Sequence, residues 1–290
     1  MDNISFAQLA ERYFTFITNR DRRPATLGSY RSNLNVILRS VPALNAAPLD
    51  SDLVEVFVGK RRAEGKSAAN INQNLRTMRA ILNFGRKRKL CLGDVEFVFL
   101  KMPKRHKMLS EDELVKVLEV AKAQDLGVYN VLRFASFTGC RKTELLTRLW
   151  ADVNFDERTL LIGARGSFQT KSGDDRVMPL TSSAIEWLRT LRESQEHNSD
   201  QDPILQKADG CPWGSHLARQ LQHVFELAGV EKIRLHGLRH LFVTKLLERG
   251  APVHSVQALA GHKSLTTTMG HYAHVRNKAL REAIDLMEDG

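Results

Sequence analysis

The first 90 residues place apolar side chains at the spacing of amphipathic helices, in four successive stretches. Pro24 opens the second stretch, as expected at the first turn of a helix. The apolar positions are Phe6, Leu9, Tyr13, Phe14 and Ile17; Leu27, Tyr30, Leu34, Ile37 and Leu38; Leu53, Val54, Phe57 and Val58; and Ile71, Leu75, Met78, Ile81, Leu82 and Phe84. The pattern predicts a small all-α domain over residues 1–92, with basic helix faces.

A linker is predicted over residues 93–108, where this periodicity stops. Gly93, Pro103 and the cations between Lys101 and Lys107 favour an extended, solvated segment. Beyond it, Ser110 and Glu113 have the spacing of a capping box ahead of an apolar helical pattern. A second, mostly helical domain is therefore expected over residues 109–290.

One part of this second domain has a strand pattern instead. Short apolar runs occur at 153–155, 160–162 and 176–180, and residues 154–157 and 172–175 provide turns between them. The runs predict a small antiparallel sheet. The expected fold class is therefore mainly α with a small antiparallel β-sheet in the second of two domains.

The positive charge of the chain is concentrated in its first part. Residues 1–108 hold 20 Lys+Arg and 9 Asp+Glu, a net charge of +11, whereas residues 109–290 have a net charge of −1. A surplus of one sign attracts polyanions, of which DNA and RNA are the commonest. On charge alone, a solubilising surface or a patch for anionic lipid explains the surplus equally well.

Membrane and disulfide-stabilised classes are not indicated. No apolar run approaches the roughly 20 residues that span a bilayer, and the N-terminus has no signal-peptide pattern. The cysteines Cys91, Cys140 and Cys211 lie far apart, without metal-ligand spacing. We expect a cytoplasmic protein with no membrane partner.

Two polar segments of the second domain carry arginines that could bind an anion. Residues 138–146 place Arg141 in the first turn of a helix, where a cation opposes the helix dipole unless an anion lies between them. A solvated surface arginine is the alternative for this segment in isolation. Further on, His236, Arg239 and His240 share one helix face. The histidine pair could bind zinc, but no third ligand follows at a familiar spacing, so no metal is expected.

A third polar segment covers residues 261–274. In it, Tyr272 follows a Thr-rich connection and lies just before the final helical stretch. The chain has four tyrosines. Tyr13 and Tyr30 lie on apolar helix stripes and Tyr129 precedes an apolar run, so those three are expected in cores. Tyr272 is therefore the candidate for chemistry.

Together, the three segments resemble the tyrosine recombinase (phage integrase) family over essentially the whole chain. The motif positions that match are Arg141 with its acidic neighbour Glu144, Lys171, His236 and Arg239, His262, and Tyr272. His262 follows Arg239 by 23 positions, as in similar proteins, and Tyr272 follows His262 by ten, one more than is usual. The resemblance implies a two-domain DNA clamp, in which a helical core-binding (SAM-like) domain is followed by a catalytic domain.

The resemblance also implies the chemistry. Arg141 and Arg239 would bind the nonbridging oxygens of a phosphodiester, and His262 would add a donor. Tyr272 would be the nucleophile, His236 its candidate base, and Lys171, on a β-hairpin, the acid for the leaving oxygen. Glu144 and His240 would hold these groups in place. The 3′-phosphotyrosine conserves the bond energy, so no ATP and no other cofactor are expected.

The partner that the resemblance implies is double-stranded DNA at specific sites with inverted arms. Integration, excision and dimer resolution all stay open as the task. The chain begins almost directly with the core-binding helices, so a Xer-like or minimal integrase without an arm-binding domain is expected. An apolar stripe at Ala279, Leu280, Ala283, Ile284 and Met287 predicts a C-terminal helix that joins a neighbour in a homotetramer on paired sites; docking on its own domain is the alternative.

Two other functions fit parts of the same pattern. A type IB topoisomerase resembles this family in its nucleophile and cations but would relax supercoils without choosing a sequence. A DNA-binding protein with a degenerate catalytic domain would bind and not cut. A covalent adduct on DNA separates the enzymes from the binding protein, and a defined cutting position separates the recombinase from the topoisomerase.

Overall fold

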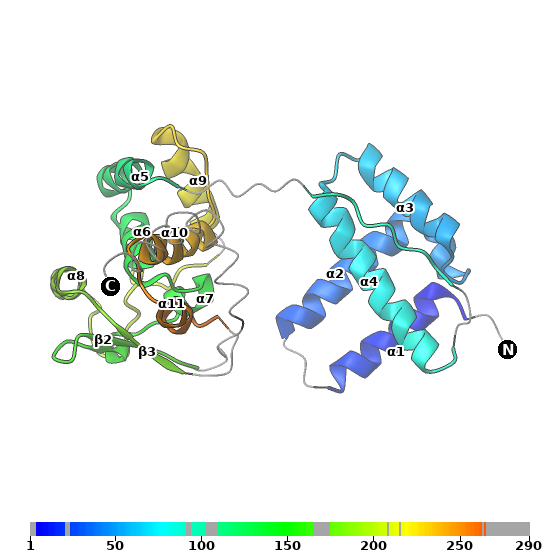
Figure 1. Cartoon of the computed structure of the whole chain (residues 1–290), viewed down its shortest axis with the longest axis horizontal. Coiled ribbons are helices and arrows are strands. Elements are labelled where there is room, and N and C mark those ends of the chain that lie inside the picture. The colour runs from blue at the N-terminus through cyan, green and yellow to red at the C-terminus, as the bar shows by residue number, and fades with distance from the viewer. Residues whose placement is uncertain are drawn as a thin grey trace, which may run out of the picture. The chain divides into compact units, whose positions relative to one another are not determined.

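The computed structural model describes residues 4–20, 24–90, 94–102, 109–164, 175–207, 209–214, 216–262 and 264. The chain divides into two compact units, Met1–Arg105 and His106–Gly290, each with its own hydrophobic core. The predicted fold class, mainly helical with a small antiparallel sheet, is confirmed (Figure 1). Within the described ranges, no helix is long and apolar enough to cross a membrane.

The first unit is helical, as predicted. It contains α1 (Phe6–Thr18), α2 (Pro24–Ser40), the 3-10 turn η1 (Pro42–Asn45), α3 (Ser51–Ala63) and α4 (Ala68–Lys87). Ser5, Asp50 and Ser67 cap α1, α3 and α4 by accepting a backbone N–H of the first turn. The apolar stripes of the four helices meet in one core, and Phe57 and Leu75 are fully buried within it. The stripe on α4 leaves Arg76 and Arg79 exposed on its opposite face.

Residues 94–102 differ from the predicted solvated linker. They are extended, but they run back along α4: Asp94 pairs with Arg86 near the end of that helix, while Leu100 exchanges two hydrogen bonds with Asn72 near its start (Figure 1). The apolar residues Val95, Phe97, Phe99 and Leu100 pack against the core of the first unit. Their burial holds the segment to the first unit, although cations flank it in the sequence.

The second unit packs its helices around α6. Its elements are α5 (Glu111–Gln124), α6 (Leu126–Thr138), α7 (Lys142–Leu146), η2 (Trp150–Asp152), β1 (Val153–Asn154), β2 (Thr159–Ile162), β3 (Arg176–Pro179), α8 (Ser182–Ser194), α9 (Leu217–Leu227), α10 (Leu235–Glu248) and α11 (Val253–Ala260). Helix α6 contacts α5, α7, α9 and α10. The predicted capping box at Ser110 and Glu113 begins α5.

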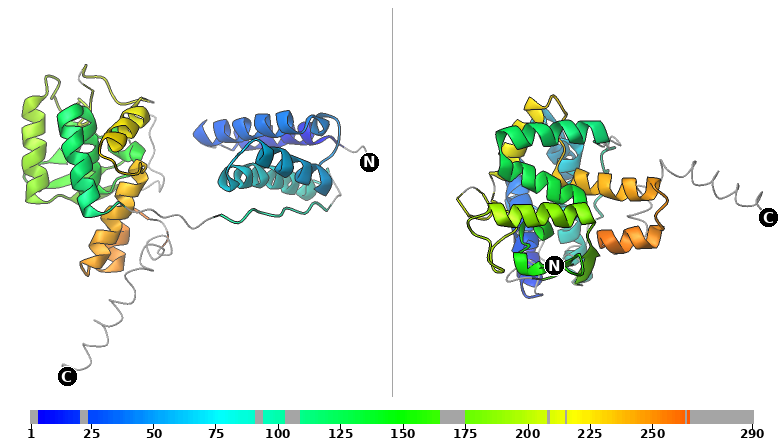
Figure 2. Two further views of the ribbon diagram at one scale, coloured as in Figure 1. Left: turned by 90° about the horizontal axis from the view of Figure 1, so that it is seen from above. Right: turned by 90° about the vertical axis from the view of Figure 1, so that its left-hand side faces the viewer.

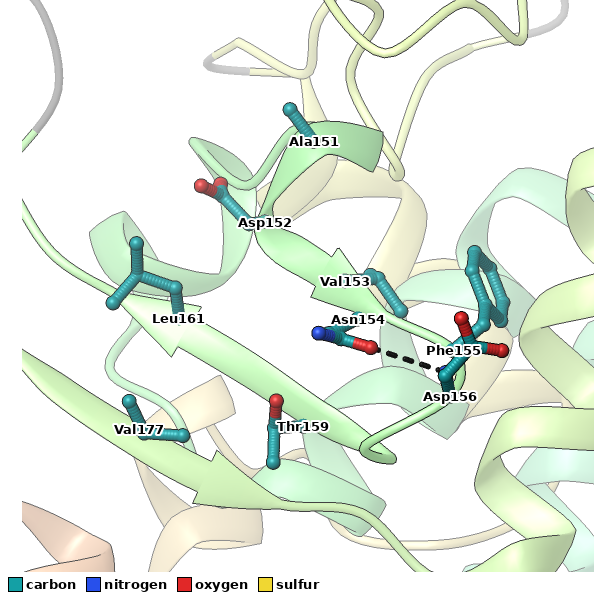
Figure 3. A pocket seen from close by; sticks show the side chains of 9 residues that line it. All are labelled: Ala151, Asp152, Val153, Asn154, Phe155, Asp156, Thr159, Leu161 and Val177. Atoms are coloured by element: carbon teal, nitrogen blue, oxygen red, sulfur yellow. Dashed lines mark hydrogen bonds between the residues drawn. The ribbon is translucent and has the colours of Figure 1, made fainter.

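The sheet has the strand order β1-β2-β3 and is antiparallel throughout. Leu160 pairs with Met178 on its buried face, and Leu161 pairs with Val177 on its exposed face. Figure 3 shows a hollow on this exposed side, lined by residues of η2 and the three strands. None of its lining residues is a predicted site residue.

Helices α10 and α11 lie side by side at one edge of the second unit (Figure 2). A small separate core joins them, formed by Val243 and Leu247 of α10 and Val256 and Ala260 of α11. This contact brings the C-terminal end of α11 close to Arg239 of α10.

Candidate active site

The turn that leads into the site depends on Gly139. This residue ends α6 in the left-handed conformation, with φ of 55°, and a Cβ at this position would collide with the Phe242 ring. Arg141 then stands at the N-cap of α7, with extended backbone, rather than in the first turn as predicted. The backbone N–H of Arg141 donates to Glu144 Oε2 at 3.0 Å.

Glu144 is the central carboxylate of the site and is only 1% exposed. It accepts hydrogen bonds from Arg141 Nη1 at 2.6 Å and from Arg176 Nη2 at 2.8 Å. Burial by itself raises the pKa of Glu144, but the hydrogen bond and charge of Arg176, followed by the hydrogen bonds of Arg141, outweigh burial and lower this pKa to about 2. Glu144 is therefore a fixed anion that holds two guanidinium groups.

Arg239 is the buried arginine of α10, also 1% exposed. It donates to the carbonyl oxygen of Gly139 at 3.0 Å and to that of Ala260. Burial, followed by the charge of Arg141, lowers the pKa of Arg239 to about 10, so the group remains a cation at neutral pH. On the same helix, the rings of His236 and His240 meet edge to face, with centroids 4.3 Å apart.

The C-terminal end of α11 gathers the three arginines. The carbonyl oxygens of its last residues and cap, Leu259, Ala260 and Gly261, accept hydrogen bonds from Arg176 Nε at 3.1 Å, from Arg239 Nη2 and from Arg141 Nη2 at 2.5 Å, respectively. The carbonyl end of a helix carries partial negative charge, which favours cations there. Three guanidinium groups facing one carboxylate still leave an excess of positive charge for an anionic ligand.

His262 is placed next to this cluster. It follows Gly261, whose φ of 63° is left-handed and ends α11. The His262 N–H donates to the carbonyl oxygen of Gln257, and its own carbonyl accepts from Gln257 Nε2 at 3.0 Å. The backbone at His262 is thus fixed by α11 itself.

The structure brings together the predicted Arg141, Glu144, Arg239 and the His262 backbone, while His236 and His240 share the helix of Arg239. Lys171 and Tyr272 lie outside the described residues. Tyr129 packs against the core of the second unit and Tyr13 against that of the first, as predicted; Tyr30 is half-buried, with its ring 5.6 Å from that of Tyr13. No group of His, Cys, Asp and Glu in the described ranges could hold a metal ion.

Arg176 is a member of the cluster that the sequence reasoning missed. A signal for it exists: Arg176 shares the inward face of β3 with Met178, which is 1% exposed. A cation at an inward position of a strand needs a buried partner, because an unpaired buried charge is costly. The sequence alone does not show that the partner of Arg176 is Glu144.

Both units of the chain match the profiles of known protein families. The profile of the Phage integrase family matches residues 107–279, and that of its N-terminal SAM-like domain matches residues 10–89. The chain therefore belongs to the phage integrase family, and it is a site-specific tyrosine recombinase.

Similar curated relatives span the chain almost completely. The tyrosine recombinase XerA of Pyrococcus furiosus is 27% identical over 96% of this chain and 93% of its own length. The tyrosine recombinase XerD of Staphylococcus saprophyticus is 26% identical over 94% of this chain and 96% of its own. A XerC-like tyrosine recombinase of Caldanaerobacter subterraneus is 22% identical over 99% of this chain and 83% of its own.

Solved structures share the fold. The Tn1549 transposon integrase in complex with circular intermediate DNA superimposes with a TM-score of 0.82 at 16% identity, covering 98% of this chain and 100% of that one. A lambda integrase tetramer bound to a Holliday junction gives a TM-score of 0.77 at 21% identity, covering 93% and 78%. The topoisomerase and the binding protein with a degenerate domain receive no support from these relatives.

Proposed function

We propose that this recombinase acts on double-stranded DNA at specific sites with inverted arms, where it cuts one strand and joins it to Tyr272 as a 3′-phosphotyrosine. The observation that carries the proposal is the arginine cluster around Glu144 at the carbonyl end of α11. A phosphodiester is already anionic and gains charge on its nonbridging oxygens during attack. Forked guanidinium donors fixed in advance stabilise that charge.

Arg141 and Arg239 are proposed to bind these oxygens. A guanidinium has five N–H donors, and the hydrogen bonds described above use two of them on each arginine. The side chain of Arg141 is 20% exposed and meets the phosphate directly. Arg239 is 1% exposed, so its contact with the phosphate includes a local shift when DNA binds.

The other site residues are proposed to carry out the attack on phosphorus and the proton transfers that accompany it. Tyr272 gives its proton to His236, and its oxygen forms the new bond to phosphorus. The 5′-oxygen leaves with a proton from Lys171, and His262 donates to a nonbridging oxygen. Glu144 and His240 hold the arginines and His236 in position. A free 5′-hydroxyl from another strand then attacks the phosphotyrosine, and the strands are exchanged without a cofactor.

The first unit is proposed to bind the DNA backbone. Its part of the chain carries the charge surplus, with a net charge of +11 over residues 1–108. On α4, exposed Arg76 and Arg79 lie over the ring of Phe99, with centroid distances of 5.8 and 4.8 Å. The ring holds both cations facing outward, where phosphates can reach them. The similar Tn1549 and lambda integrases were solved on DNA, which supports this partner.

A homotetramer on paired sites is the proposed assembly. Exchange between two duplexes needs four cuts and hence four active sites, and the similar lambda integrase forms a tetramer on a Holliday junction. The predicted C-terminal helix that would join neighbours lies outside the described residues. As an enzyme that acts on DNA, the protein is proposed to work in the cytoplasm.

Sequencing of covalent adducts tests the proposed function. The full chain is incubated with fragmented genomic DNA from its source, adducts are trapped by denaturation, and the DNA ends attached to protein are sequenced. Recombinase activity predicts one or a few defined cutting positions flanked by inverted arms. Adducts spread over the genome would indicate a topoisomerase instead, and the complete absence of adducts would indicate a binding protein.

A further inference from the structure

Arg176 makes contacts on two sides of the site. Its Nη2 pairs with Glu144 at 2.8 Å, and its Nε donates to the Leu259 carbonyl of α11 at 3.1 Å. Its Nη1 is buried, has no hydrogen-bond partner among the described residues, and lies 2.8 Å from where a Cβ at Gly261 would stand. The side chain is 13% exposed. Arg176 therefore joins the first residue of β3 to Glu144 and to the end of α11.

The end of β2 is tied to the same glutamate from the other side. Arg148, which is 1% exposed, donates from Nε to the Glu144 carbonyl oxygen at 3.1 Å. Its Nη1 and Nη2 donate to the carbonyl oxygens of Leu161 and Gly163, at 3.0 and 2.9 Å. Arg148 thus fixes the end of β2 relative to Glu144, as Arg176 fixes the start of β3.

The two strand ends are also joined directly. Ile162 pairs with Arg176 in the sheet, and the Ala164 N–H donates to Asp175 Oδ1 at 3.0 Å. The connection between β2 and β3, residues 165–174, contains Lys171. Both ends of that connection therefore start from a frame that is anchored on Glu144, the carboxylate that also holds Arg141.

We propose that Arg176 is a positioning residue for strand cleavage: its pair with Glu144 sets the β3 end of the Lys171 connection relative to Arg141 and the end of α11. The inference rests on the proposed function, in which Lys171 protonates the leaving 5′-oxygen. Lys171 precedes Arg176 by five residues in the sequence, and the proposal is that a shift of this strand end is transmitted to the acid. A misplacement of about 1 Å can cost a hundredfold in rate, even when the changed residue is remote from the chemistry.

The leaving group provides a readout that a purely structural role does not change. Suicide duplexes carrying the site found by adduct sequencing are made with oxygen or with sulfur at the 5′-bridging position. A thiolate leaves without protonation, so a variant with a missing or misplaced acid recovers on sulfur. The ratio of the sulfur rate to the oxygen rate is measured, because a partly unfolded preparation lowers both rates equally and leaves the ratio unchanged.

Relative to the unmodified protein, Arg176→Met is expected to raise this ratio at least about tenfold, in the direction of Lys171→Ala. Arg176→Lys keeps a charge for Glu144 and should give a smaller rise; it also serves if Arg176→Met does not fold. Arg141→Lys should leave the ratio unchanged, because its defect lies in binding the phosphate. Arg189→Met removes an exposed charge from α8, outside the network, and should change neither rate.

The outcomes separate the two levels of the proposal. If Lys171→Ala leaves the ratio unchanged, the acid role of Lys171 is wrong and the role of Arg176 falls with it. If Lys171→Ala raises the ratio while both Arg176 variants leave it unchanged, the acid role stands and the positioning role of Arg176 is wrong. Arg176 would then contact the phosphate itself or stabilise only the fold.

Discussion

Arg141 Nη2 donates to the carbonyl oxygen of Gly261 at 2.5 Å, across 120 residues of sequence. Arg141 begins α7, and Gly261 ends α11, one residue before His262 and eleven before Tyr272. The proposed phosphate-binding arginine is therefore hydrogen-bonded to Gly261, which precedes the proposed nucleophile in the sequence. Displacement of one of these groups is expected to affect the other.

Lysine cannot replace either proposed clamp arginine. Arg141 bridges Glu144 and Gly261, and Arg239 bridges Gly139 and Ala260, which a single ammonium cannot do with the same geometry. Arg141→Lys and Arg239→Lys should each slow single-turnover cleavage about 10²–10³-fold. Cleavage on a suicide duplex is compared with that of Arg158→Lys, an exposed arginine between β1 and β2. Near-normal cleavage by a clamp variant would make that arginine structural.

The stability of the second unit should depend on pH through Glu144. Its pKa is lowered from 4.5 to about 2, so the ionised carboxylate stabilises the fold above pH 4.5, and this contribution is lost as the pH falls towards 2. It amounts to roughly 3 kcal/mol of unfolding free energy. Denaturant unfolding followed by tryptophan fluorescence measures it, because Trp150, Trp187 and Trp213 all lie in the second unit.

Glu144→Gln is the comparison for that measurement. The difference in unfolding free energy between the unmodified protein and this variant should shrink as the pH is lowered from 4.5 to 2, because protonation then removes the charge of Glu144, whereas the glutamine of the variant is uncharged throughout. A difference that stayed constant over this range would mean that Glu144 is not held as an anion by its arginines.

Arg148 should be a major determinant of stability. It is 1% exposed, pairs with the equally buried Asp152 at 3.4 Å, and donates to three backbone carbonyls. Arg148→Met removes the buried countercharge of Asp152 and one donor from each of those carbonyls, and should lower the unfolding free energy by about 3–5 kcal/mol. Lys245→Met, which removes the pair with the exposed Glu111, should cost much less, because water screens that pair. Equal costs for the two variants would contradict this role.

The main elements of the fold could be predicted from local patterns. Pro24, the Ser110 capping box and the short apolar runs at 160–162 and 176–180 all correspond to observed helix starts or strands, because capping and burial act over a few residues. Residues 94–102 were misjudged: the cations that flank the segment favoured a solvated linker, whereas alternate apolar residues hold it on the first unit.

The site could be predicted only in part. Arg141, Arg239 and Glu144 follow from the family resemblance, and the structure brings them together. Arg176 and Arg148 could not be placed, because many of their acceptors are backbone carbonyls of other segments, such as Leu259, 83 residues from Arg176. A carbonyl has no side-chain signature, so the sequence does not show which carbonyl will accept a distant guanidinium.

The C-terminal segment should matter for assembly rather than for binding. Deletion of residues 277–290 removes the whole of the predicted apolar stripe that would dock on a neighbour, while the arginine cluster and α4 remain. We expect the truncated protein to bind one site normally in a mobility-shift assay, to form no complex with paired sites, and not to recombine them. Recombination of paired sites at the normal rate would show that the segment is dispensable.

Identification of the residue that becomes linked to DNA tests the central claim most directly. The full chain is trapped on a suicide duplex, the adduct is digested with protease and nuclease, and the nucleotide-bearing peptide is sequenced by mass spectrometry. The account predicts a 3′-phosphotyrosine at Tyr272, and Tyr272→Phe should bind the duplex normally and form no adduct. A nucleotide on any other residue, or an adduct formed by Tyr272→Phe, would contradict it.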